Sequence, residues 1–79
     1  MSEGYDVNIF LDRNCKGIGV RDNRNGIYVT FPTCDSVPSY VSSLKPSKKV
    51  MASHNIGLDN VAYITAKLKE AGISVERTD

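Results

Sequence analysis

Apolar and polar residues alternate in three short runs, and this alternation constrains the fold more than any other feature of the sequence. The runs are Tyr5–Leu11, Ile18–Val20 and Ile27–Phe31. A period of two residues is typical of strands that bury one face. The segments between the runs are rich in Asp, Asn, Gly and basic residues, as tight turns are. The sequence therefore predicts three strands joined by two turns.

The positions of the apolar residues test whether these three strands belong to one sheet, because parity requires the apolar residues of paired strands to oppose one another. Directly opposed residues of an antiparallel pair share a face. If the turns are centred between residues 14 and 15 and between residues 24 and 25, every opposed pair is apolar. These pairs are Leu11 with Ile18, Ile9 with Val20, Val20 with Val29, and Ile18 with Phe31. We therefore predict an antiparallel meander that is apolar on one face.

The second half of the chain changes to a helical period. One stripe consists of Val37, Tyr40, Val41 and Leu44, with Asp35 or Ser36 as its N-cap. A second stripe consists of Val61, Ile64, Leu68 and Ala71, with Asp59 as its N-cap. Ile73–Val75 follows as a last strand, and Val50–Ala52 is either a short strand or part of a loop. The predicted fold is one α+β domain over residues 1–79, ordered β-β-β-α-α-β, with the helices packed on one sheet face.

Two thiols and one imidazole are the obvious reactive groups. Cys15, Cys34 and His54 lack the close spacing of a zinc site. Catalysis by a Cys-His pair would need a lowered thiol pKa and a third, orienting group, and Cys34 is interpreted instead as a small residue that ends a strand. We therefore predict no catalytic residue, no metal and no cofactor. A cysteine enzyme or a small-ligand sensor is the third interpretation. If pairing continues past the third strand, Cys15 lies opposite Cys34; otherwise Cys15 stays in its turn and the two do not meet.

The stretch LDNVAYITAKLKEAGISVER, residues 58–77, resembles the helix–strand unit of ACT regulatory domains and of glyoxalase-like modules. Such a unit has an amphipathic helix, then Ala-Gly, then a β-branched strand. The three strands at the start depart from the ACT order, and His54 is the only histidine for a chelating site. The chain is assigned to neither family.

Exposed aromatic and basic residues point to a partner surface. Phe10 and Tyr28 project from the sheet face opposite the apolar one, and the turn between the second and third strands carries Arg21, Asp22 and Arg24. Arg and Tyr are prominent among the residues that dominate binding energy. We therefore predict that these five residues contact a partner protein.

The composition favours a protein partner over nucleic acid. Net charge is +1, which gives no strong attraction to a polyanion. Lys45, Lys48 and Lys49 form a basic cluster that supports the alternative, an accessory protein that contacts phosphates. No signal peptide or membrane segment is recognised, so we expect a cytoplasmic protein of unknown oligomeric state. The leading hypothesis is a small docking module that blocks a partner, as phage and mobile-element inhibitors such as anti-CRISPR proteins do.

Overall fold

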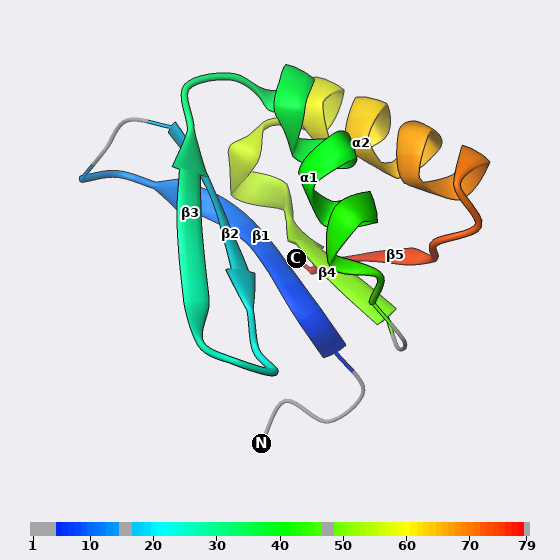
Figure 1. Cartoon of the computed structure of the whole chain (residues 1–79). Coiled ribbons are helices and arrows are strands. Elements are labelled where there is room, and N and C mark those ends of the chain that lie inside the picture. The colour runs from blue at the N-terminus through cyan, green and yellow to red at the C-terminus, as the bar shows by residue number, and fades with distance from the viewer. Residues whose placement is uncertain (1–4, 15–16, 47–48, 79) are drawn as a thin grey trace.

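The computed structural model describes residues 5–14, 17–46 and 49–78 and shows one sheet with two helices. The strands are β1 (Tyr5–Asp12), β2 (Gly17–Asp22), β3 (Ile27–Phe31), β4 (Lys49–Ser53) and β5 (Val75–Thr78). The helices are α1 (Val37–Leu44) and α2 (Leu58–Glu70), preceded by the short 3-10 turns η1 (Cys34–Ser36) and η2 (His54–Ile56). The spatial strand order is β3-β2-β1-β4-β5. Both helices lie on the same side of the sheet (Figure 1).

The meander predicted by parity is confirmed. β1 pairs antiparallel with β2, and β2 pairs antiparallel with β3. The register contains all four predicted pairs: Ile9 with Val20, Leu11 with Ile18, Val20 with Val29, and Ile18 with Phe31. The apolar face of the meander is the face that the helices cover.

The predicted element order was wrong at one point, because the segment around Val50 is a strand. The observed order is β-β-β-α-β-α-β, and β4 lies between β1 and β5, parallel to both. Parallel neighbours require a long crossover, and here α2 supplies the one from β4 to β5. The strand is short and central, so Val50 and Ala52 are fully buried and their run shows no alternation long enough to identify it.

The helix ends differ in detail from the expected caps. Ser36 is the N-cap of α1, as one of the two predictions had it, and its side chain makes no capping hydrogen bond. The predicted N-cap of α2 was wrong. Gly57, with a φ of 105°, holds that position, and Asp59 lies inside the first turn, where a carboxylate still favours the helix dipole.

The core lies between the helices and the covered face of the sheet. Its members are Val7, Ile9, Ile18, Val20, Val37, Val41, Val50, Ala52, Ile56, Val61, Ile64 and Leu68. Leu44, from the first helical stripe, and Val29, from the apolar face of the meander, are only half-buried. Val29 belongs to the outermost strand, beyond the cover of the helices. No described helix is long and apolar enough to cross a membrane.

Candidate functional site

The sheet face away from the helices carries most of the polar and aromatic residues that no core contact explains. We call it the open sheet face. Its residues alternate with core residues along each strand, and they include Asn8, Phe10, Arg21, Tyr28, Thr30, Met51, Ser53 and Glu76. No described helix covers this face, because α1 and α2 both lie on the opposite one (Figure 1).

One row of directly opposed residues crosses the open sheet face. Tyr28 of β3 opposes Arg21 of β2, Arg21 opposes Asn8 of β1, and Asn8 opposes Met51 of β4. A hollow of about 310 Å³ lies over the middle of this row; it is lined by Asn8, Ile9, Phe10, Arg21, Met51 and Ser53. The row therefore combines a cation, an amide and a thioether around one depression.

Two polar groups in this hollow are uncommitted within the described part of the chain. The Oδ1 atom of Asn8 is buried and has no hydrogen-bond donor there. The guanidinium of Arg21 is exposed, and no hydrogen bond or ion pair from a described residue holds it. A buried acceptor without a donor costs free energy, so a ligand that donates to Asn8 would recover that cost.

Gly19 of β2 makes room for the Phe10 ring. A Cβ atom on Gly19 would lie 2.6 Å from the Phe10 ring, which therefore rests directly on the β2 backbone. The Tyr28 ring meets the Phe10 ring edge to face at 5.6 Å, and its hydroxyl donates to Asp12 Oδ2. Tyr28 thus reaches from β3 across β2 to β1. The pair is held in place, yet Tyr28 remains 48% exposed.

A charged cluster closes the β5 end of the same face. Lys49 Nζ donates to Glu76 Oε2 at 2.5 Å, and the Tyr5 hydroxyl donates to Glu76 Oε1 at 2.5 Å. These bonds, first from Lys49 and then from Tyr5, lower the pKa of the Glu76 carboxyl. The same bond to Glu76 raises the pKa of Lys49. Lys49, Tyr5 and Glu76 are bonded to one another, whereas no described residue makes a side-chain hydrogen bond or ion pair with Arg21.

The predicted site residues do not all lie together. Phe10, Tyr28 and Arg21 share the open sheet face. Asp22, only 2% exposed, faces the other side of the sheet. Arg24, at the tip of the β2–β3 turn, is bound within the chain. Whether any of the five contacts a partner stays a prediction.

Arg24 ties the β2–β3 turn to the end of α1. Its Nε and Nη2 atoms donate to the two carboxylate oxygens of Asp22, at 3.0 and 3.1 Å. Its guanidinium also donates to the carbonyls of Leu44 (2.6 Å) and Lys45 (3.2 Å), where α1 ends. A cation at a helix C-terminus satisfies free carbonyls and favours the dipole. These bonds indicate a structural role for Arg24 and Asp22.

The basic cluster and the reactive groups are less informative. Lys49 is paired with Glu76, Lys45 ends α1 in the left-handed conformation (φ 50°), and Lys48 lies outside the described residues, as does Cys15. A hollow of about 310 Å³ borders Cys34, and His54 is not among the residues that line it. Among residues 5–14, 17–46 and 49–78, no three His, Cys, Asp or Glu side chains gather as metal ligands do.

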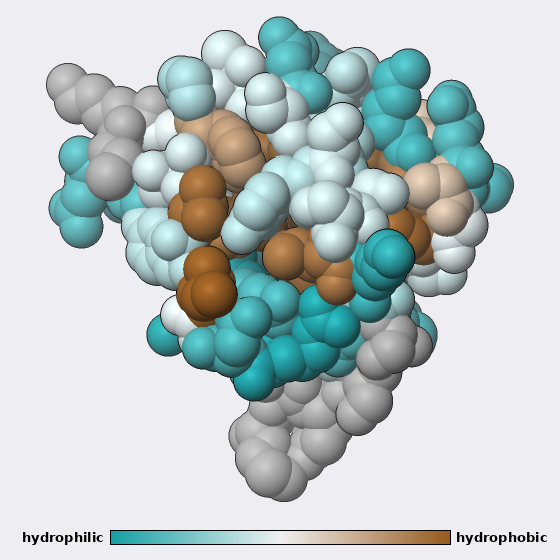
Figure 2. Space-filling view, viewed as in Figure 1, coloured by the Kyte–Doolittle hydropathy of each residue, from teal (hydrophilic) through white to brown (hydrophobic). Residues whose placement is uncertain are grey.

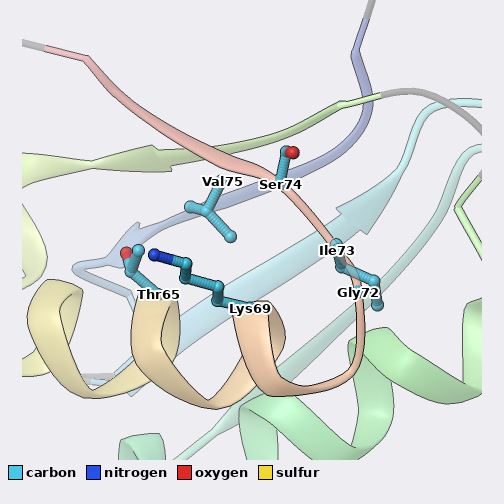
Figure 3. Close-up of a pocket in the computed structure, with 6 residues that line it drawn as sticks. All are labelled: Thr65, Lys69, Gly72, Ile73, Ser74 and Val75. Atoms are coloured by element: carbon cyan, nitrogen blue, oxygen red, sulfur yellow. The ribbon is translucent and has the colours of Figure 1, made fainter.

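Another hollow lies between α2 and the segment that leads into β5. It measures about 380 Å³ and is lined by Thr65, Lys69, Gly72, Ile73, Ser74 and Val75. Figure 3 shows Thr65 and Lys69 side by side on α2, with Val75 facing them from β5. The buried Thr65 hydroxyl has no hydrogen-bond partner in the described chain. Its polar side chains are those of Thr65, Lys69 and Ser74. No carboxylate, imidazole or thiol is among the described residues that line it, so we assign this hollow no role.

Comparisons of the chain with protein-family models, with curated proteins and with solved structures find no match. Function is therefore inferred from the residues of the open sheet face. Sequence reasoning identified Phe10, Arg21 and Tyr28 there and missed Asn8 and Met51. Gly19 was the signal that the Phe10 ring packs on the backbone of β2.

Proposed function

We propose that this chain is a protein-docking module whose open sheet face binds an acidic, partly apolar surface of another protein. One observation carries the proposal: the uncommitted Arg21 guanidinium and the unpartnered Asn8 oxygen line one hollow with Phe10 and Met51. Arg, Met and aromatic residues are enriched at protein interfaces. A carboxylate of the partner would pair with Arg21, and a donor beside it would reach Asn8.

The size of the hollow favours a protein over a small molecule. At about 310 Å³ it lies at the bottom of the range of ligand pockets, roughly 300–1,000 Å³. An open, partly aromatic face with a central Arg instead has the composition of a binding hot spot, in which a few anchor residues supply most of the binding energy. The rings of Phe10 and Tyr28 are already fixed by their contact, so little side-chain entropy is lost on binding.

Nucleic acid is the second candidate, because aromatic rings on an open sheet can stack bases. The charge argues against it. Lys49, the described lysine on this face, is neutralised by Glu76, and the whole chain carries a net charge of +1. Affinity for nucleic acid depends on several unpaired cations along the backbone path.

A charge reversal at Arg21 should weaken docking strongly without unfolding the chain. We expect immobilised wild type to retain one protein from a nuclease-treated lysate of the native cells, and Arg21→Glu to lose it. With the purified partner, Arg21→Glu should weaken binding by roughly tenfold or more. The matched control is Arg77→Glu, the same change at an exposed position of β5; it should bind within about twofold of wild type. Equal affinity of Arg21→Glu and wild type, or capture that nuclease abolishes, would contradict the proposal.

A further inference from the structure

Strand β3 forms one edge of the sheet, and no described strand pairs with its outer side. Its five residues, Ile27–Phe31, include no charged residue and no proline. Natural proteins commonly guard an edge strand with lysine, proline or a bulge, because unpaired backbone groups recruit other strands. The opposite edge, β5, carries Glu76 and Arg77. Of the two edges, β3 is therefore the one suited to pairing.

The register shows which backbone groups of β3 are free to pair. The N–H of Asn23 donates to a β1 carbonyl at 2.7 Å, so this residue directs its backbone groups toward β1. Successive residues of a strand alternate in this direction. Val20 therefore directs its groups toward β3, where it pairs with Val29. The residues on either side of Val29, which are Tyr28 and Thr30, direct their N–H and C=O groups outward.

The side chains of β3 add an apolar row along the same edge. Ile27, Val29 and Phe31 lie on the helix side of the sheet, where Ile27 is 53% exposed and the other two are half-buried. Figure 2 shows hydrophobic side chains gathered over β3, beside the helices. A strand that docks here must pair its backbone with the outward N–H and C=O groups of Tyr28 and Thr30. It must also place apolar side chains beside Ile27, Val29 and Phe31.

We propose that the occupant of this edge is β3 of a second copy of the chain, in antiparallel pairing about a two-fold axis at Val29. Strand β3 itself meets each requirement of the edge. Tyr28 of each copy opposes Thr30 of the other, and each of these two pairs shares two backbone hydrogen bonds. On the helix side, Ile27 faces Phe31 of the second copy and Val29 faces its own equivalent. All facing pairs in this row are apolar.

The axis of this dimer is perpendicular to the sheet, so both copies keep their helices on the same side. The two open sheet faces then form one surface, with the Tyr28 side chains near its centre. The dimer doubles the number of Arg21 side chains on that surface. It does not depend on the proposed docking function, because mass measurements test it without a partner.

Opposite charges at position 29 test the geometry, because this pairing alone places residue 29 of one copy against residue 29 of the other. Sedimentation equilibrium from roughly 1 µM to 1 mM should show wild type shifting from one chain to two. Val29→Lys and Val29→Glu should each weaken self-association by roughly tenfold or more, because like charges face each other. An equimolar mixture of the two variants should restore the dimer. Lys69→Glu, on the exposed side of α2, should associate as wild type does.

A wild type that stays a single chain at the highest concentration would overturn the proposal, as would a mixture that stays monomeric while both variants are folded. If a charge at position 29 prevents folding, Val29→Cys in a chain with Cys15→Ser and Cys34→Ser decides the matter. Directly opposed, non-hydrogen-bonded residues of antiparallel strands lie within disulfide reach. Mild oxidation should link two such chains, whereas Lys69→Cys in the same background should give no comparable product. Equal linking at both positions would contradict the pairing.

Discussion

Replacing Ile64 with alanine is expected to lower the free energy of unfolding by about 3 kcal/mol. Ile64 is fully buried and belongs to the stripe of α2 that packs on the sheet. Its removal leaves a cavity beneath a single layer of helices, with few neighbours able to move in. A domain of 79 residues has little stability to spare, so this loss threatens the fold. Urea unfolding at one fixed protein concentration measures it.

The adjacent residue provides the control for this prediction. Thr65 lies on the same helix, and its buried hydroxyl has no hydrogen-bond partner among the described residues. Thr65→Ala removes that unsatisfied group and improves helix propensity, so the free energy of unfolding should change by less than about 0.5 kcal/mol. A loss under about 1 kcal/mol for Ile64→Ala, or equal losses for the two variants, would show that α2 does not cover the core as described.

Asp22→Ala is expected to lower the free energy of unfolding by about 1–2 kcal/mol, through loss of charge-assisted hydrogen bonds. The nearly buried Asp22 carboxylate accepts two bonds from the Arg24 side chain and one from its backbone N–H. The Arg24 side chain is 38% exposed, so solvent weakens the pair. Arg24→Ala should lower the free energy of unfolding more than Asp22→Ala does. It leaves the nearly buried Asp22 carboxylate without its Arg24 side-chain partner, and it removes the hydrogen bonds to the carbonyls at the end of α1. Urea titrations of wild type and the two single variants measure these free energies of unfolding. If the double variant is no less stable than Arg24→Ala, the two side chains stabilise the fold as a coupled pair.

Acid provides a second readout of the same pair. The hydrogen bond from the Arg24 side chain lowers the pKa of Asp22 in the folded chain. The ionised carboxyl therefore stabilises the fold above the ordinary aspartate pKa of about 4, and this contribution is lost as the pH falls through the lowered value. Wild type should lose stability below about pH 5 more steeply than Asp22→Ala. Parallel acid profiles of the two chains would mean that the pair does not form.

The meander could be predicted because its information is local. Two turns and the alternation of three runs define a register, and every opposed pair from Ile9–Val20 to Ile18–Phe31 is as parity requires. Strand β4 could not be predicted in the same way. Its neighbours β1 and β5 are far along the chain and parallel to it, so no turn defines the pairing. Its residues Val50–Ala52 are too few to show a period.

The error at β4 also hid part of the candidate site. Phe10, Arg21 and Tyr28 belong to the meander, so their common face followed from the alternation. Met51 joins them only because β4 pairs with β1, which is a long-range contact. The role of Arg24 was hidden for the same reason, since the carbonyls that it binds are 20 and 21 residues away in sequence. Local patterns predict which face a residue is on and do not predict which distant segment lies beside it.

Chemical-shift mapping of the isotope-labelled chain, during titration with the purified partner protein, tests the docking role of the open sheet face most directly. The largest changes are expected at Asn8, Phe10, Arg21 and Met51, which surround the hollow. Exposed residues of α2, such as Ala62 and Lys67, should keep their shifts because they lie on the opposite side of the sheet. Changes centred on α2, with the residues around the hollow unaffected, would contradict the proposed docking surface.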